Sequence, residues 1–147
     1  FSNHKPGGKQ LDAFNFYLDQ TSEYWKSFST YEKAIAALVL RRNDKTDKAM
    51  TIISSLKEYA QQSEEMGMYW KDNVAGYFWY QAPIETQAML IEAFNEVAKD
   101  ETAVEEMKIW LLRNKQTNYW KTTKATSEAI YALLITGSKL LDESKLL

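Results

Sequence analysis

One unit recurs three times in this chain: a tryptophan stands nine residues before an alanine that lies early in an apolar helical stretch. The three pairs are Trp25 and Ala34, Trp79 and Ala88, and Trp120 and Ala129. The alanines are separated by 54 residues (34 to 88) and by 41 residues (88 to 129). A recurrence of this length indicates a repeated supersecondary unit.

The helices that contain these alanines are expected to be the most buried parts of the protein. They are predicted over residues 30–42, 83–97 and 125–136. Ser29 and Glu32 have the spacing of a capping box, Pro83 suits the first position of a helix, and Thr123 is the expected N-cap of the third. The stretches are apolar on most faces, so each should be buried. Their aliphatic runs of about seven residues are far too short to cross a bilayer.

Amphipathic helices alternate with the buried ones. They are predicted over residues 10–20 and 47–62, and from a capping box formed by Thr102 and Glu105. Residues 63–82 form a long aromatic connector. An inner ring of buried helices wrapped by amphipathic helices satisfies this order, which predicts an all-α fold: part of an α/α toroid built from helical hairpins. A plain α-solenoid is the alternative, although its helices are usually amphipathic in both positions.

The 147 residues are expected to form a single all-helical domain fragment. Residues 1–9 should be a loose N-terminal segment, because they contain one proline and two glycines. Residues 140–147 are expected to be a linker or the start of a further helix. The first residue is not methionine and no signal peptide is visible, so we expect an excised fragment or a processed product.

Charge and composition exclude several classes of site. The formal net charge is −2, and the lysines and arginines are scattered, which argues against a nucleic-acid partner. The chain has no cysteine, so it has no disulfide, thiolate metal site or cysteine nucleophile. We predict no cofactor and no metal ligand.

Few residues are candidates for chemistry. The only histidine, His4, lies in the loose N-terminal segment, so no histidine-based zinc site or Ser-His triad can form. Glu85 and Glu128 stand near the starts of two buried helices, where they either complement helix dipoles or form a carboxylate pair for glycoside hydrolysis. The Trp and Tyr loops either pack against helix ends or stack on sugars, and we favour packing. Four scattered aspartates are interpreted as caps and turn residues. They are Asp44, Asp47, Asp72 and Asp100.

Four segments together resemble a known family. They are residues 67–70 (GMYW), 83–88 (PIETQA), 110–117 (WLLRNKQT) and 119–134 (YWKTTKATSEAIYALL). Over about residues 17–141, and most clearly after Met68, the chain resembles the C-terminal half of the thioester-domain region of bacterial alpha-2-macroglobulin-like proteins. The resemblance implies an α/α toroid, of the type also found in terpenoid cyclases and protein prenyltransferases.

The same resemblance implies a function in a larger protein. That protein would be periplasmic or associated with the cell envelope, would flank this region with β-rich domains, and would inhibit endopeptidases by trapping them after they cleave a bait region. Family members that bear a thioester use a cysteine and a glutamine three residues later. This chain has no cysteine, so no functional residue is carried over to it.

The sequence is compatible with three candidate functions. The first is a non-catalytic helical fragment of a macroglobulin-like protease trap, with proteases as partners of the intact protein. The second is an α/α-toroid carbohydrate-active enzyme or a fragment of one, which needs paired acids at an open cleft. The third is a helical-repeat binding module. We expect no enzymatic activity and no catalytic residue in this chain.

Overall fold

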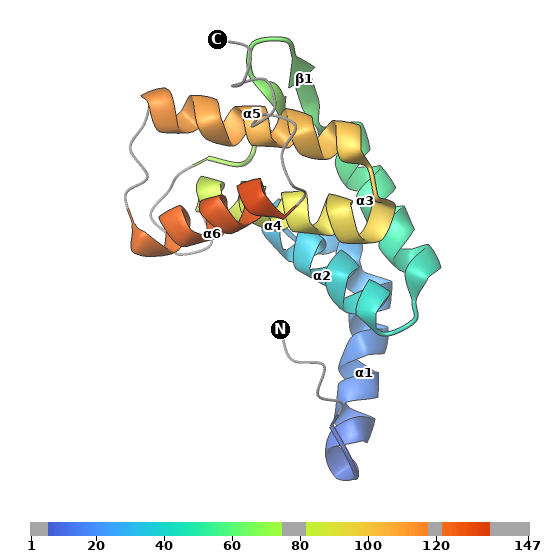
Figure 1. Ribbon diagram of the computed structural model, residues 1–147. Helices are drawn as coiled ribbons and strands as arrows, with labels where there is room; N and C mark the ends of the chain where they lie inside the picture. The colour runs from blue at the N-terminus through green and yellow to red at the C-terminus, as the bar shows by residue number, and fades with distance from the viewer. Residues whose placement is uncertain (1–5, 75–81, 118–121, 136–147) are drawn as a thin grey trace.

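The protein is mostly helical in the computed structural model, which describes residues 6–74, 82–117 and 122–135 (Figure 1). The helices are α1 (Lys9–Tyr24), α2 (Thr30–Arg42), α3 (Thr46–Tyr59), α4 (Pro83–Ala93), α5 (Glu101–Thr117) and α6 (Thr123–Leu134). A 3-10 turn, η1 (Trp25–Ser27), follows α1, and a π-helical turn, η2 (Phe94–Ala98), extends α4. The predicted all-α class is confirmed.

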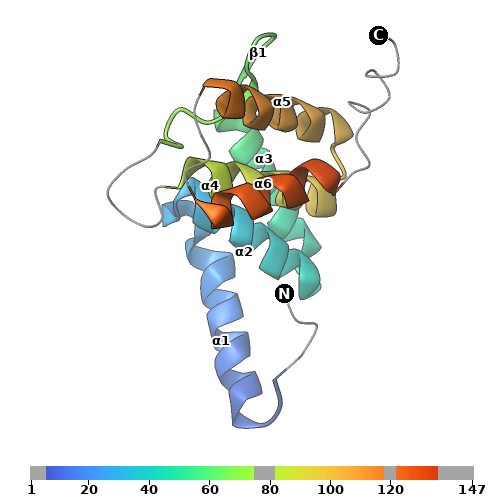
Figure 2. The same ribbon diagram turned by 60° about the vertical axis from the view of Figure 1, so that its left-hand side comes forward.

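Helix α4 lies at the centre of the molecule. It packs against α2 on one side and α6 on the other, and the three helices run in the same direction (Figures 1 and 2). Helix α3 packs on α2, and α5 packs on α4. Eight of the eleven residues of α4 are buried, because neighbours cover it on several sides.

Burial separates α2 from α3 as the sequence predicts. Five of the thirteen residues of α2 are buried, against four of the fourteen residues of α3. The predicted capping box also begins α2, since Ser29 Oγ accepts from the Glu32 N–H at 3.3 Å and Glu32 Oε2 accepts from the Ser29 N–H at 2.8 Å. The amphipathic stripe of α3 is buried as expected. It consists of Ala49, Ile52, Ile53 and Leu56.

The described part of the connector predicted over residues 63–82, up to residue 74, contains regular structure. A short antiparallel hairpin pairs β1 (Gln61–Ser63) with β2 (Gly67–Tyr69), so an entirely helical chain was the wrong expectation. Helix α3 accordingly ends at Tyr59 rather than at residue 62. The hairpin is too small to be stable alone. It is held by packing of β2 on α5, a tertiary contact that local sequence patterns do not encode.

Two predicted helix starts are wrong by one or two residues. Thr122, not Thr123, caps α6, and its Oγ1 accepts from the Ala125 N–H at 3.0 Å. Helix α5 is capped by Asp100, whose Oδ1 accepts from the Ala103 N–H at 3.1 Å, instead of by Thr102. In both places neighbouring residues are similarly good caps, so the sequence leaves the choice open.

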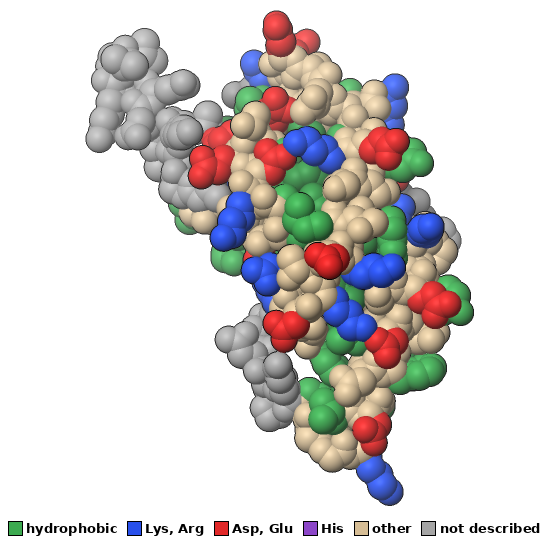
Figure 3. Space-filling view, turned by 90° about the vertical axis from the view of Figure 1, so that its right-hand side faces the viewer, with side chains coloured by type: hydrophobic (Ala, Val, Ile, Leu, Met, Phe, Trp, Pro, Cys, Tyr) green, Lys and Arg blue, Asp and Glu red, His purple; other side chains and the backbone are tan. Residues whose placement is uncertain are grey.

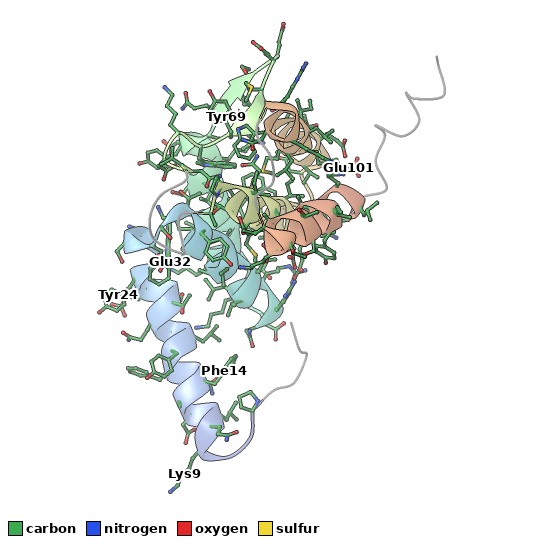
Figure 4. The ribbon with its side chains drawn as sticks, turned by 90° about the vertical axis from the view of Figure 1, so that its left-hand side faces the viewer. Lys9, Phe14, Tyr24, Glu32, Tyr69 and Glu101 are labelled. Atoms are coloured by element: carbon green, nitrogen blue, oxygen red, sulfur yellow. The ribbon has the colours of Figure 1, made fainter. Side chains whose placement is uncertain are left out.

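Helix α1 is longer than predicted and stands out from the body of the molecule (Figures 1 and 2). It starts at Lys9, inside the segment expected to be loose, and continues to Tyr24, through part of the expected connector. Phe14 and Tyr24 project from different sides of the helix in the view of Figure 4. Only Leu18 is fully buried, and α1 contacts α2 near its C-terminal end.

Helix α6 is less buried than predicted. Only Ala125, Ala129 and Ala132 are buried. Ile130, Tyr131 and Leu134 have 48%, 55% and 65% of their surface exposed. The small alanine side chains allow α6 to lie against α4, while no element of the described chain covers the opposite face. The prediction that residues 125–136 are buried on almost every side is therefore wrong. Helix α5, which was expected to be an outer helix, buries more of its residues than α6 does.

Candidate functional site

Several candidate residues lie outside the described part of the chain. They are His4, residues 77–80 of the aromatic connector, Tyr119 and Trp120. The described tryptophans are structural. Trp25, Trp70 and Trp110 are all buried. Trp70 packs edge-on against Phe94 with ring centroids 6.0 Å apart, and its Nε1 donates to Leu56 O at 2.9 Å. For Trp25 and Trp70, which lie in the predicted aromatic connectors, the packing interpretation is confirmed.

Glu85 and Glu128 lie near the N-terminal ends of two neighbouring helices that run in the same direction, α4 and α6. Glu85 is in the first turn of α4 with 9% of its surface exposed, where the helix dipole favours a carboxylate. Glu128 lies beyond the first turn of α6, where the dipole effect has faded. It pairs with Lys124 of the same helix at 3.6 Å. The dipole interpretation therefore fits Glu85 and not Glu128.

The four aspartates do not come together. Asp44 has a φ of 63° in the turn between α2 and α3, and Asp47 lies in the first turn of α3. Asp100 caps α5, and Asp72 accepts a hydrogen bond from Thr30 Oγ1 at 2.8 Å. Among the residues that the structure describes, no group of three or more His, Asp or Glu side chains could hold a metal ion.

A buried glutamine joins three elements and was missed by the sequence analysis. Gln87 of α4 is fully buried, and its Nε2 donates to Met68 O of β2 at 2.8 Å and to Met107 O of α5 at 3.3 Å. Its Oε1 has no hydrogen-bond partner within the described part of the chain. A polar residue within the apolar run of α4 was the available signal. Its role is structural, because it holds the hairpin and α5 to the central helix.

Ion pairs tie the central helices together at their C-terminal ends. Arg42 Nη2 of α2 contacts Glu92 of α4 at 2.9 Å and Glu96 of η2 at 2.6 Å. The hydrogen bond with Glu96 raises the pKa of the guanidinium above its ordinary value, with a further contribution from Glu92, while burial opposes the change. Arginine is charged at any physiological pH, so the guanidinium can pair with both carboxylates throughout that range.

A hollow of about 300 Å³ lies between the start of α2, the C-terminal half of α3 and the turn after β2. Its lining residues are Thr30, Lys33, Ser55, Leu56, Tyr59, Trp70, Lys71 and Asp72. We call it the α2–α3 groove. Sequence analysis missed the groove because its walls come from three segments that only the tertiary fold brings together.

Positive and negative side chains are mixed on one face of the molecule. On the face shown in Figure 3, Lys and Arg side chains are interspersed with Asp and Glu side chains, without a large area of one sign. This is not the basic surface that nucleic-acid binding requires. Within the described ranges, no helix is both long and apolar enough to cross a bilayer.

Comparison of the chain with the models of known protein families, with characterised proteins and with solved structures finds no match.

Proposed function

We propose that this chain is a non-catalytic helical part of a macroglobulin-like protein that traps proteases. One observation carries the proposal: α2, α4 and α6 lie side by side in the same direction, and α3 and α5 pack on them. An arc of an α/α toroid would have this order of inner and outer helices. The arrangement supports the fold that the family resemblance implies.

The exposed face of α6 is compatible with the same proposal. Ile130, Tyr131 and Leu134 would be covered by a further hairpin if α2, α4 and α6 are three consecutive inner helices of a larger ring. In such a ring the helical body would move as a unit when a protease cleaves the bait region. The proposed partners are proteases, met by the intact protein, and β-rich domains of the same polypeptide. The proposed location is the periplasm or the cell envelope.

In the proposed protein, any covalent reaction with the protease would be carried out by a region outside this chain. A thioester requires a cysteine, and this chain has none. Its role would be to shield or present a reactive segment rather than to react.

The test uses the intact protein encoded by the gene, purified and incubated with a protease at equimolar concentration. A trapped protease should lose activity on a large protein substrate while it keeps activity on a short peptide, because the cage blocks access without blocking the protease active site. The 147-residue chain alone should inhibit neither reaction and form no gel-stable adduct. Equal inhibition of both substrates, or no inhibition by the intact protein, would contradict the trap.

A carbohydrate-active enzyme is the second candidate, favoured by the position of Glu85 and Glu128 near the same ends of α4 and α6. Glycosidases use two carboxylates that flank the scissile bond. A panel of polysaccharides separates the candidates. Sugar release that disappears in Glu85→Gln or Glu128→Gln would support the enzyme and exclude a purely structural role.

A further inference from the structure

The floor of the α2–α3 groove contains a buried tryptophan whose indole N–H is hydrogen-bonded. This residue is Trp70, and its indole nitrogen donates to Leu56 O at 2.9 Å. Across the groove, the hydrogen bond from Thr30 to Asp72 ties the first turn of α2 to the turn after β2. Figure 4 labels Glu32 and Tyr69, which mark the two elements that these contacts connect. The groove is therefore a preformed feature of the packed fold.

Two lysines on the groove have no side-chain partner among the residues that the structure describes. Neither Lys33 nor Lys71 makes an ion pair or a side-chain hydrogen bond with the described part of the chain, although both line the groove. The acidic neighbour of Lys33 is engaged elsewhere, because Glu32 Oε2 accepts from both the N–H and the hydroxyl of Ser29 at 2.8 Å. Among the described residues that line the groove, Asp72 is the only acidic one. The groove thus carries an excess of positive charge, which favours an anionic ligand.

An exposed aromatic ring stands at the rim. Tyr59 ends α3, lines the groove and has 70% of its surface exposed. An aromatic side chain offers an apolar ring face together with a polar hydroxyl tip. Ser55, Thr30 and Asp72 add short polar side chains along the same walls. This combination of one ring and several hydroxyl or carboxylate groups matches a sugar, which has apolar C–H faces and many hydroxyl groups.

We infer that the α2–α3 groove binds an acidic saccharide, with one sugar ring stacked on Tyr59 and its carboxylate held by Lys33 and Lys71. The volume of about 300 Å³ is at the small end of ligand pockets, which suits one or two sugar units. We infer binding without cleavage, because hydrolysis by a carboxylate pair needs two acids and the described lining residues include one, Asp72. The inference is independent of the proposed protease trap.

The probe is a trimer of galacturonic acid, titrated into the 147-residue chain at low salt and followed by calorimetry and by amide chemical shifts in NMR. We expect the largest shifts at Ser55, Tyr59 and Lys71. The methyl-esterified trimer has the same shape without the charge and should bind at least about tenfold more weakly, since two surface ion pairs are together equivalent to about a tenfold change. Raising the salt concentration should weaken only the acidic trimer.

Variants test the named residues. Tyr59→Ala and the double variant Lys33→Gln/Lys71→Gln should each weaken binding of the acidic trimer by about tenfold. The matched controls are Tyr17→Ala, an exposed tyrosine on α1, and Lys48→Gln, an exposed lysine on α3, which should leave binding unchanged. Circular dichroism establishes that each variant is folded.

Three outcomes would overturn the inference. The first is the absence of shifts at the groove residues when the acidic trimer is added. The second is equal affinity for the acidic and esterified trimers, or unchanged affinity in the groove variants. The third is tighter binding of a triglutamate peptide than of the sugar trimer, which would assign the groove to an acidic polypeptide instead.

Discussion

The backbone of Gly67 in β2 lies directly against the backbone of α5. Its φ is +66°, and a Cβ atom built on it would lie 2.1 Å from the carbonyl oxygen of Glu106. A left-handed conformation costs other residues about 1–2 kcal/mol, and a backbone atom cannot move aside as a flexible side chain can. Glycine is therefore required here by both its conformation and its size.

Replacing Gly67 by alanine should lower the free energy of unfolding by roughly 2–5 kcal/mol, the sum of the conformational cost and an overpacking cost. The measurement is denaturant unfolding followed by circular dichroism at a fixed protein concentration. Gly7→Ala is the control, because a Cβ at Gly7 meets no atom within 4 Å. The explanation fails if the two variants are equally stable.

At the scale of elements, one ion pair joins the end of α3 to the start of α5. Lys57 Nζ lies 2.5 Å from Asp100 Oδ2, while Asp100 Oδ1 caps α5. The hydrogen bond from Lys57 is the main cause that lowers the pKa of Asp100, helped by the Ala103 N–H and opposed by burial. A lowered folded-state pKa stabilises the protein above the unfolded-state pKa of about 3.9, and this contribution is lost as the pH falls through the lower, folded-state value.

Asp100→Asn should therefore lower the free energy of unfolding by about 0.5–1 kcal/mol at pH 7, as for a partly exposed ion pair. The difference from the parent protein should shrink as the pH falls below about 4. Urea unfolding at several pH values measures both effects. Lys57→Gln removes the partner and keeps the cap, so it should abolish most of the pH-dependent difference. A difference between Asp100→Asn and the parent that stays constant from pH 7 to pH 3 would rule out this linkage.

At the scale of the whole molecule, one face of α6 exposes large apolar side chains to solvent. Three large apolar residues within five positions are about half exposed or more: Ile130, Tyr131 and Leu134. Contiguous exposed apolar surface favours association. We expect the chain to self-associate as its concentration rises, in sedimentation velocity runs from the micromolar to the millimolar range.

The double variant Ile130→Gln/Leu134→Gln should remain monomeric over that range, because glutamine is polar and still a good helix former. The control is Phe16→Gln/Tyr17→Gln, which removes two exposed aromatic rings from α1 instead. Association that is lost in the α1 variant and kept in the α6 variant would move the contact to α1. A parent chain that is monomeric at every concentration would contradict the prediction.

Helix positions were largely predictable from the sequence. The capping box at Ser29 and the proline at residue 83 mark starts that the structure reproduces, because these signals act within one turn of the chain. The amphipathic stripe of α3 was predictable for the same reason: the period of a helix fixes which residues share a face. Asp100 and Thr122 show where local signals fail, since neighbouring residues with similar capping ability compete for one helix start.

Tertiary structure decided what the sequence left open. Burial of α6 depends on which elements cover it, so its apolar composition predicted a buried helix while the fold leaves half of it exposed. The hairpin at residues 61–69 exists because α5 supports it. The α2–α3 groove depends on residues 30, 59 and 71 meeting across the fold. Local periodicity and capping are properties of neighbouring residues, whereas coverage and grooves arise only when distant segments pack together.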